Sequence, residues 1–309
     1  MTSAPDGRPG HVWIDGELLP ADGRHLSVFD RGFQLGDGVF ETLRARAGHP
    51  TELDAHLARL HRSADGLDIE LPADVDGLLA RGITALLAAE GLDGPGGDAS
   101  IRITVSRGPF RARGVLPPAD GASATIAIQA WPVVAAPADH LERGLHLVAS
   151  SVRRDPRNPL ATLKTTSRAE YVYARLEARR VGADDALFLT IDDHLSEGTS
   201  ANIFLVRSSA AGQQELATPS LDCAILPGTT RSWLLEWAAK VGLRPVEARL
   251  RRDDLAAADE AFLSSSVAGI LPVTAFEGTP IGDGLPGPWT ARARSAREAM
   301  IREGEGATA

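Results

Sequence analysis

The sequence predicts an α+β fold in two domains, and three observations support this prediction. Segments with the pattern of strands and segments with the pattern of helices follow one another without strict alternation, which disfavours a doubly wound parallel sheet. Residues 132–140 are rich in proline and small side chains, as expected of a linker. No internal repeat is apparent in the 309 residues. We therefore expect an N-terminal domain over residues 1–131 and a C-terminal domain over residues 141–309.

The N-terminal half begins with a predicted disordered lead over residues 1–10 and a hairpin. The hairpin is indicated by Asp15-Gly16 between two apolar stretches. Apolar residues then recur at helical intervals in two segments and alternate with polar residues in others. The elements expected from these patterns are a strand over 39–46, helices over 53–67 and 75–90, and strands over 100–106 and 122–131.

The C-terminal half shows the same mixture of patterns. Residues 165–181 place alanine, valine, tyrosine and leucine on one helical face, and residues 225–228 open a second helix. Asp192-Asp193 stands at a turn between two apolar runs. The elements expected here are strands over 145–151, 186–191, 202–206 and 261–266 and helices over 165–181 and 229–241.

Composition narrows the class of protein. The net charge is −9 and the arginines are scattered, which disfavours a surface for nucleic acid or anionic membrane. No apolar run is long enough to span a bilayer, and the first residues lack the apolar core of a signal peptide. The single cysteine, Cys223, excludes an internal disulfide and a cysteine-based zinc site. We expect a cytoplasmic protein.

Lysine is rare in this chain. Only Lys164 and Lys240 occur among 32 basic residues, which suggests that a retained lysine serves through its amine. An amine can act as a nucleophile or a base, which a guanidinium cannot. Apolar residues precede Lys164, and desolvation by them would lower the pKa of the amine, as Schiff-base chemistry requires. The alternative is a lysine that reaches solvent from the start of a helix.

Several polar residues are further candidates. Glu197 lies in a turn between apolar strands, where it could pair with a protonated heterocycle or be a solvated turn residue. Thr229 and Thr230 stand at a helix start, which favours either an anion site or simple N-capping. Ser266 adds a hydroxyl at the end of a strand, where serine is otherwise common in turns. Arg59 lies off the apolar stripe of its helix, so periodicity places it on the surface.

The loop Arg107–Gly114 concentrates positive charge. Its arginines could bind a substrate carboxylate through paired hydrogen bonds, with a solvated loop as the alternative. The eight histidines show no spacing of metal ligands, so we expect no metal site. There is no phosphate loop of the Walker type and no nucleophile elbow of the Gly-x-Ser-x-Gly type.

Taken in order, these segments resemble the class IV (fold type IV) pyridoxal-phosphate aminotransferases. That family includes branched-chain and D-amino-acid aminotransferases, (R)-amine transaminases and 4-amino-4-deoxychorismate lyase. The similarity runs from about Trp13 to Phe276. It is carried by Asp30-Arg-Gly-Phe-Gln-Leu-Gly-Asp-Gly-Val-Phe-Glu, His56-Leu-Ala-Arg-Leu, Leu163-Lys, Ser196-Glu-Gly-Thr-Ser-Ala-Asn-Ile-Phe and Ile225-Leu-Pro-Gly-Thr-Thr-Arg.

The resemblance implies a smaller N-terminal α/β domain, a larger C-terminal domain with a pseudo-barrel of strands, and pyridoxal 5'-phosphate between them. The lysine of the Schiff base would be Lys164, in the C-terminal domain, and it would also move the proton between Cα and C4′. The partner of the pyridinium nitrogen would be Glu197. The residue supporting the ring face would be Leu226. The phosphate would be bound by Arg59, Thr229, Thr230 and Ser266. A homodimer with shared active sites is also implied.

For the substrate, the resemblance points to Phe33 and Phe40 as pocket residues and to the loop arginines as a carboxylate trap. Those arginines are Arg107, Arg111 and Arg113. The chain has Leu163-Lys-Thr-Thr-Ser-Arg where the lyases often show Leu-Lys-x-Leu-Asn-Arg. Branched-chain enzymes have a tyrosine where this chain has Ala169.

The first hypothesis is therefore a transaminase that moves an amino group from D-amino acids, and from (R)-amines as a further donor class, to a 2-keto acid in a ping-pong reaction. The alternatives are 4-amino-4-deoxychorismate lyase, which releases pyruvate and 4-aminobenzoate, and a branched-chain L-amino-acid aminotransferase. A third interpretation is an interaction domain that keeps the fold without the chemistry. The presence of the lysine, the glutamate and the phosphate-site residues together argues against this last alternative.

Overall fold

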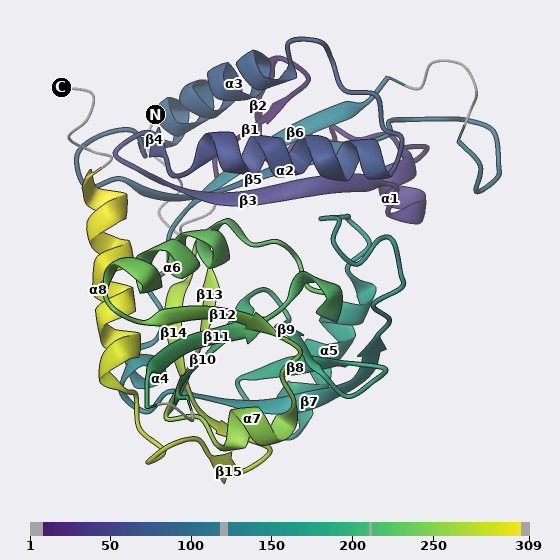
Figure 1. Ribbon diagram of the computed structural model, residues 1–309. Coiled ribbons are helices and arrows are strands. Elements are labelled where there is room, and N and C mark those ends of the chain that lie inside the picture. Colours follow the sequence, from purple (N-terminus) through teal and green to yellow (C-terminus); the bar gives the residue numbers. More distant parts are fainter. Residues whose placement is uncertain (1–8, 118–122, 210–211, 304–309) are drawn as a thin grey trace. The chain divides into compact units, whose positions relative to one another are not determined.

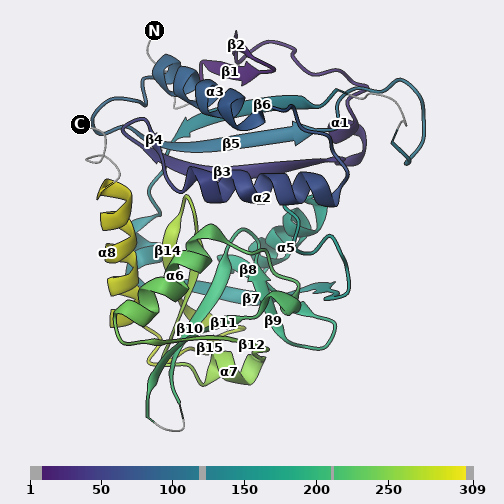
Figure 2. The same cartoon turned by 45° about the horizontal axis from the view of Figure 1, so that its top comes forward.

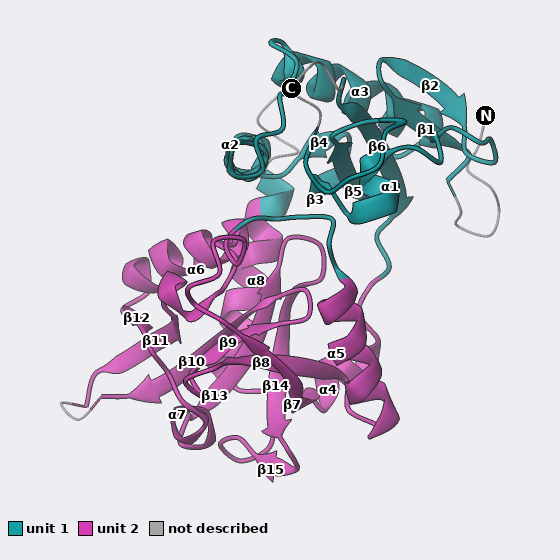
Figure 3. Ribbon diagram, turned by 90° about the vertical axis from the view of Figure 1, so that its right-hand side faces the viewer, with its two compact units in different colours: residues 1–134, 163–168, 301–309 teal, residues 135–162, 169–300 magenta. Residues whose placement is uncertain are grey.

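The computed structural model describes residues 9–117, 123–209 and 212–303 (Figure 1). The chain divides into two compact units, coloured separately in Figure 3. Unit 1 comprises Met1–Val134, Leu163–Arg168 and Ile301–Ala309. Unit 2 comprises Ala135–Thr162 and Ala169–Met300. Within the described residues, no helix is both long enough and apolar enough to span a membrane.

Unit 1 is built on a six-stranded sheet of order β2-β1-β6-β5-β3-β4. Every neighbouring pair is antiparallel. The hairpin predicted at Asp15-Gly16 is present, and both residues have positive φ, as a tight turn of this kind requires. The strands are β1 (His11–Ile14), β2 (Glu17–Pro20), β3 (Gly38–Arg46), β4 (His49–Pro50), β5 (Asp98–Ser106) and β6 (Thr125–Pro132).

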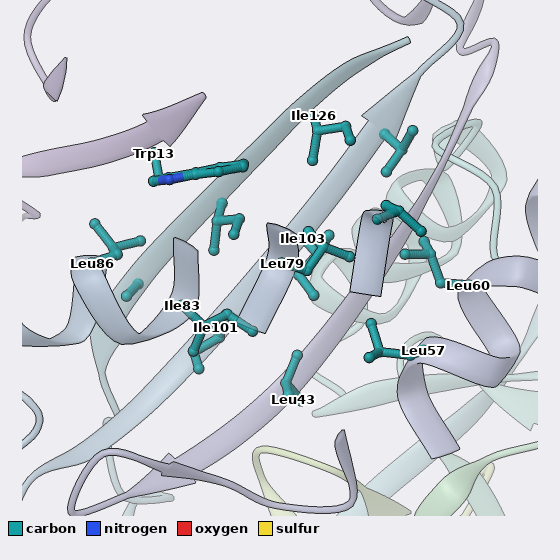
Figure 4. Close-up of a cluster of buried hydrophobic side chains, with 14 of the residues drawn as sticks. Trp13, Leu43, Leu57, Leu60, Leu79, Ile83, Leu86, Ile101, Ile103 and Ile126 are labelled. Atoms are coloured by element: carbon teal, nitrogen blue, oxygen red, sulfur yellow. The ribbon is translucent and has the colours of Figure 1, made fainter. Parts of the chain in front are cut away.

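Two helices lie along this sheet (Figures 1 and 2). They are α2 (Leu53–Gly66) and α3 (Val75–Glu90), and a short helix, α1 (Arg31–Leu35), precedes β3. Alternate residues of β3 and β5 point toward α2 and α3 and form one apolar core with them. Figure 4 shows part of this core, including Leu43, Leu60 and Ile83.

The segment Leu163–Arg168 belongs to unit 1, although we expected Lys164 within the C-terminal domain. Its backbone pairs with the start of β3. The Phe40 amide donates to the Lys164 carbonyl at 2.9 Å, and the Thr166 amide donates to the Gly38 carbonyl at 2.8 Å. This pairing keeps the segment extended, so the helix predicted from residue 165 begins only at residue 169.

Unit 2 contains a nine-stranded mixed sheet that closes on itself. Six strands, β10-β13-β14-β7-β8-β9, are neighbours in that order, and β9 pairs again with β10 through Glu197 and Asn202. The predicted pseudo-barrel of strands is therefore present. The strands are β7 (Leu145–Arg154), β8 (Asp185–Thr190), β9 (Leu195–Gly198), β10 (Asn202–Ser208), β11 (Gln214–Pro219), β12 (Arg244–Ala248), β13 (Glu260–Ser265), β14 (Gly269–Phe276) and β15 (Thr279–Pro280).

Alternation along the strands separates the interior of the barrel from its covered outer face. On β10, Ile203 and Leu205 belong to the interior cluster, whereas Phe204 and Val206 pack against helices. The helices on that outer face are α6 (Thr229–Lys240) and α8 (Pro288–Glu303). The other helices of unit 2 are α4 (Ala138–Glu142), α5 (Ala169–Arg180), α7 (Arg252–Ala256) and a 3-10 turn over Leu221–Cys223.

Several elements differ from the sequence-based expectations. The structure adds α8 and strands β11, β12 and β14, which the sequence patterns did not single out. Helix α4 begins inside the predicted linker 132–140, so the linker and the domain limits remain predictions. The lead over 1–10 and the start of the 122–131 strand lie largely or partly outside the described residues.

Candidate active site

Lys164 lies in the extended segment that joins β3 rather than at a helix start. Its backbone amide donates to Ser63 Oγ of α2 at 3.1 Å. Its amine lies 4.6 Å from the centre of the Phe40 ring. The segment is bonded on both sides, since Thr166 Oγ1 also donates to the Gly36 carbonyl at 2.8 Å. The position of this lysine is thus fixed by backbone pairing.

A buried ion pair lies next to this lysine in unit 1. The Glu41 carboxylate accepts from Arg59 through Nε and Nη2, each at 2.7 Å, and from His56 Nδ1 at 2.7 Å. All three side chains are buried, so the surface position predicted for Arg59 is wrong. The reason is that His56 and Arg59 are three residues apart and share the face of α2 that packs on β3.

The charge of this cluster is set by its partners. Burial would raise the pKa of Glu41, but hydrogen bonds from Arg59 and His56, together with the charges of Arg59 and Lys164, outweigh burial and lower the pKa to about 2. Glu41 is therefore a carboxylate throughout the physiological pH range. Its two oxygens hold the guanidinium of Arg59 in one plane.

Phe40 is surrounded by cations in unit 1. Besides the Lys164 amine, the guanidinium carbon of Arg102 lies 4.0 Å from the ring centre and that of Arg168 lies 5.6 Å from it. Burial, and then the charge of Arg168, lowers the pKa of the Arg102 guanidinium. This concentration of positive charge would favour a negatively charged ligand.

The arginine-rich loop is fastened to unit 1 at both ends. At one end, Arg107 binds the Asp37 carboxylate at 2.8 and 3.1 Å. At the other end, Arg31 donates to the carbonyls of Gly114 and Val115 at 3.2 and 2.7 Å and to Asp37 at 2.7 Å. Burial opposes ionisation of Asp37, but its hydrogen bonds from the two arginines prevail and lower its pKa. The two ends of the loop are therefore anchored to unit 1.

The arginines of this loop have different surroundings. The guanidinium of Arg107 donates to the Asp37 carboxylate and to backbone carbonyls, so its hydrogen-bond donors are used within the fold. Arg111 and Arg113 are exposed, and Arg111 lies 5.9 Å from the Phe29 ring. Phe33 is 74% exposed on unit 1, in contrast to the buried Phe40.

In unit 2, Glu197 lies on β9 and is buried, so it is not a solvated turn residue. One carboxylate oxygen accepts from the Leu226 amide at 2.9 Å, and the other accepts from the Tyr171 hydroxyl at 3.3 Å. Arg154 lies 3.8 Å from Glu197. These contacts fix the orientation of the Glu197 carboxylate.

Thr229 and Thr230 are the first two residues of α6. The N-cap is Gly228, which makes no side-chain cap, so N-capping does not explain the threonines. Both are buried, and Thr229 Oγ1 lies 3.2 Å from Ser266 Oγ. The hydroxyls of Thr229 and Ser266 therefore come together at a helix start, where the helix dipole favours an anion.

The residues of unit 2 are chemically suited to the phosphate and the ring nitrogen of pyridoxal phosphate. Ser264 Oγ, near the end of β13, is buried and has no hydrogen-bond partner in the described part of the chain. Such an atom is costly unless a ligand or water satisfies it. Neutral hydroxyls and amides suit a phosphate, and a buried carboxylate suits a protonated pyridine.

Sequence reasoning missed several residues that the structure places around these groups. Glu41 interrupts the core-facing positions of β3, where Val39, Leu43 and Ala45 are apolar, and this interruption was a usable signal. The contacts of Arg154 and Arg102 depend on the tertiary packing of distant strands and left no such signal.

The family follows from comparison with known proteins. Residues 38–276 match the family model of the class IV aminotransferases, and the chain belongs to this family. Its cofactor is pyridoxal 5'-phosphate, and a related branched-chain aminotransferase, 28% identical to this chain, was solved with pyridoxamine 5'-phosphate. The two-domain α+β fold with a barrel of strands is that of fold type IV enzymes, as predicted.

Relatives within the family differ in activity. The branched-chain aminotransferase structure from Escherichia coli is 28% identical, covers 95% of each chain and has a TM-score of 0.86. The 4-amino-4-deoxychorismate lyase structure from Pseudomonas aeruginosa is 32% identical, covers 93% of this chain and 98% of the lyase, and has a TM-score of 0.78. The D-alanine aminotransferase of Bacillus licheniformis is 28% identical over 94% of this chain and 96% of its own.

Proposed function

We propose that this aminotransferase moves an amino group from D-amino acids to 2-keto acids in a ping-pong reaction. (R)-amines are a further donor class in this proposal. One observation carries the choice of a carboxylate-bearing substrate: the residues Gly36–Gly38 fasten both the reactive lysine segment and the arginine-rich loop.

The two attachments are direct. The carbonyls of Gly36 and Gly38 accept from Thr166, two residues after Lys164. The carboxylate of Asp37 binds Arg107 at the start of the loop. Gly36 has φ of 67°, and a Cβ there would lie 2.5 Å from Ser167 Oγ, so glycine is required for this close approach. One short segment thus ties the lysine to the loop that presents Arg111 and Arg113.

Paired guanidiniums are suited to a substrate carboxylate, because each can donate two parallel hydrogen bonds. The cations around Phe40 add to the attraction for an anion. We propose Arg111 and Arg113 as carboxylate-binding residues and Phe33 and Phe40 as pocket residues. Arg107 acts on the substrate indirectly in this proposal, by fixing the loop.

We assign a different role to each of the cofactor residues. Pyridoxal phosphate, when bound, supplies an electron sink. We propose that Lys164 binds it as a Schiff base and carries the proton from the substrate Cα, while Glu197 keeps the ring nitrogen protonated. Leu226 supports the ring face. The phosphate is assigned to Arg59, Thr229, Thr230 and Ser266.

We also propose a cytoplasmic homodimer whose active sites are shared. Unit 1 exposes apolar side chains from two segments that Arg31 joins through its bonds to the Gly114 and Val115 carbonyls. Exposed apolar side chains on neighbouring segments are typical of an interface. The exposed residues are Leu26, Val28, Phe29, Phe33, Leu35, Val115 and Leu116.

A half-reaction tests the substrate. The yellow holoenzyme is mixed separately with D-alanine, L-leucine and (R)-1-phenylethylamine, with no keto acid, and its absorbance is followed. Bleaching by D-alanine and not by L-leucine is expected. Bleaching by L-leucine alone would instead make the enzyme a branched-chain aminotransferase. Release of pyruvate from 4-amino-4-deoxychorismate, with no bleaching by the three donors, would make it a lyase.

A further inference from the structure

A buried arginine lies behind the threonines of α6. Arg297, on α8, is 1% exposed and is the largest of the fully buried side chains among the described residues. Placing a guanidinium in the interior of a domain is expensive, and an apolar residue of similar size is often equally stable or more so. An arginine at this position therefore calls for a role beyond packing.

Its contacts lead to α6. Arg297 Nη2 donates to Thr230 Oγ1 at 3.3 Å. The guanidinium carbon lies 5.2 Å from the ring centre of Trp233, one turn further along α6. Arg297 thus touches α6 at its first turn, which is the positive end of the helix dipole.

The direction of the hydrogen bond has a consequence. A guanidinium has only donors, so Thr230 Oγ1 must be the acceptor. The hydroxyl proton of Thr230 is then directed to a different acceptor. The N-cap, Gly228, has no side chain to accept that proton, and Thr230 stands at the positive end of the helix dipole. An anion is the ligand that would accept the proton and be favoured by the dipole.

We propose that Arg297 is a positioning residue for the phosphate of pyridoxal phosphate. It holds the Thr230 hydroxyl as a donor and places a positive charge behind the start of α6. This inference rests on the assignment of Thr230 to the phosphate in the proposed function.

The test compares two ligands that differ only in the phosphate. Full-length protein stripped of cofactor is titrated with pyridoxal 5'-phosphate and with pyridoxal, and the dissociation constants are measured from absorbance. Arg297→Met is expected to weaken binding of the phosphate ester roughly tenfold or more, as the loss of a charge-assisted bond implies. Binding of pyridoxal should change less than about twofold.

Matched variants separate position from charge. Arg292→Met removes an exposed arginine of the same helix, which stacks on Trp289, and should leave both affinities unchanged. Arg297→Lys keeps the charge and should lose less affinity than Arg297→Met. If Arg297→Met does not fold, Arg297→Gln replaces it, since it keeps a donor, removes the charge and should show the same selective loss.

The variant Thr230→Val separates the role of Arg297 from the assignment of Thr230 to the phosphate. A loss of phosphate-ester affinity in Thr230→Val, with a double variant Thr230→Val/Arg297→Met no weaker than the weaker single variant, supports the role of Arg297. An equal loss for pyridoxal and its phosphate ester in Arg297→Met, or no loss, overturns it. Unchanged affinity in Thr230→Val overturns the phosphate assignment and this inference with it.

Discussion

The two units hold their proposed cofactor residues in different ways. In unit 1, Arg59 is fixed by a buried carboxylate, Glu41, with His56 on the same oxygen pair. In unit 2, the hydroxyls of Thr229 and Ser266 lie 3.2 Å apart at the start of α6, and Thr230 is the next residue of that helix. Removing one charge from the first arrangement should cost much fold stability, whereas removing one neutral hydroxyl from the second should cost the fold less.

The largest effect is expected from the reactive amine of unit 1. Lys164→Ala should abolish turnover and leave the fold intact, because the side chain contributes chemistry while its backbone makes the pairing to β3. Steady-state transamination measures the rate and circular dichroism the fold. The control is Lys240→Ala, which removes the other, exposed lysine. Near-normal turnover in Lys164→Ala would refute the assignment.

In unit 2, Glu197→Gln should slow the half-reaction about a hundredfold, within the range usual for the loss of acid–base and electrostatic assistance. The amide keeps the shape but cannot hold the ring nitrogen protonated. Stopped-flow absorbance with D-alanine gives the rate. A half-reaction as fast as that of the parent enzyme would remove Glu197 from this role.

Glu41→Gln tests the fully charged arrangement by stability. Removing one partner of a buried pair costs about 3–5 kcal/mol, because the other charge stays buried. The melting temperature should therefore fall clearly. Asp74→Asn breaks an exposed pair with Arg81 and should cost about 1 kcal/mol or less. Equal shifts in the two variants would show that burial does not set the cost.

Lowering the pH should reduce the stability difference between the parent protein and Glu41→Gln. The pKa of Glu41 is lowered in the fold from an ordinary 4.5 to about 2, so its stabilising contribution is complete above pH 4.5 and is lost as the pH falls toward 2. The gap in unfolding temperature between the parent protein and Glu41→Gln should narrow over that interval. A gap that stays constant down to pH 2 would contradict the charge-based account.

The smallest effect is expected at the exposed loop. Arg113→Ala should raise the KM for D-alanine severalfold, roughly as expected for one exposed charged contact, with little change in kcat. Arg179→Ala, exposed on α5, is the control. An unchanged KM in both Arg111→Ala and Arg113→Ala would place the substrate carboxylate elsewhere, with Arg102 and Arg168 the next residues to test.

Local sequence order singled out candidate residues, whereas the contacts that depend on tertiary packing did not follow from it. The segments around Lys164, Glu197 and Thr229 stand in a recognisable order. The partner of Arg59 did not follow from helical periodicity, because Glu41 comes from a strand 18 residues away and meets Arg59 only when α2 packs on β3.

The elements of the fold also differ in whether local sequence patterns or tertiary packing determine them. The hairpin at Asp15 and the helices α2 and α3 follow from local patterns. The start of α5 did not, because backbone pairing of residues 164–166 with β3 overrides the helical pattern. Helix α8 is polar over most of its length, and its buried Arg297 breaks the usual apolar stripe.

The central claim is that one particular amine carries the cofactor, and the chain allows a direct test because it has only two lysines. Borohydride reduction of the holoenzyme makes the lysine–cofactor link permanent, and peptide mass spectrometry then locates the added pyridoxyl group. We expect it on Lys164 and not on Lys240. A label on Lys240, or an unlabelled Lys164 in yellow holoenzyme, would contradict the account.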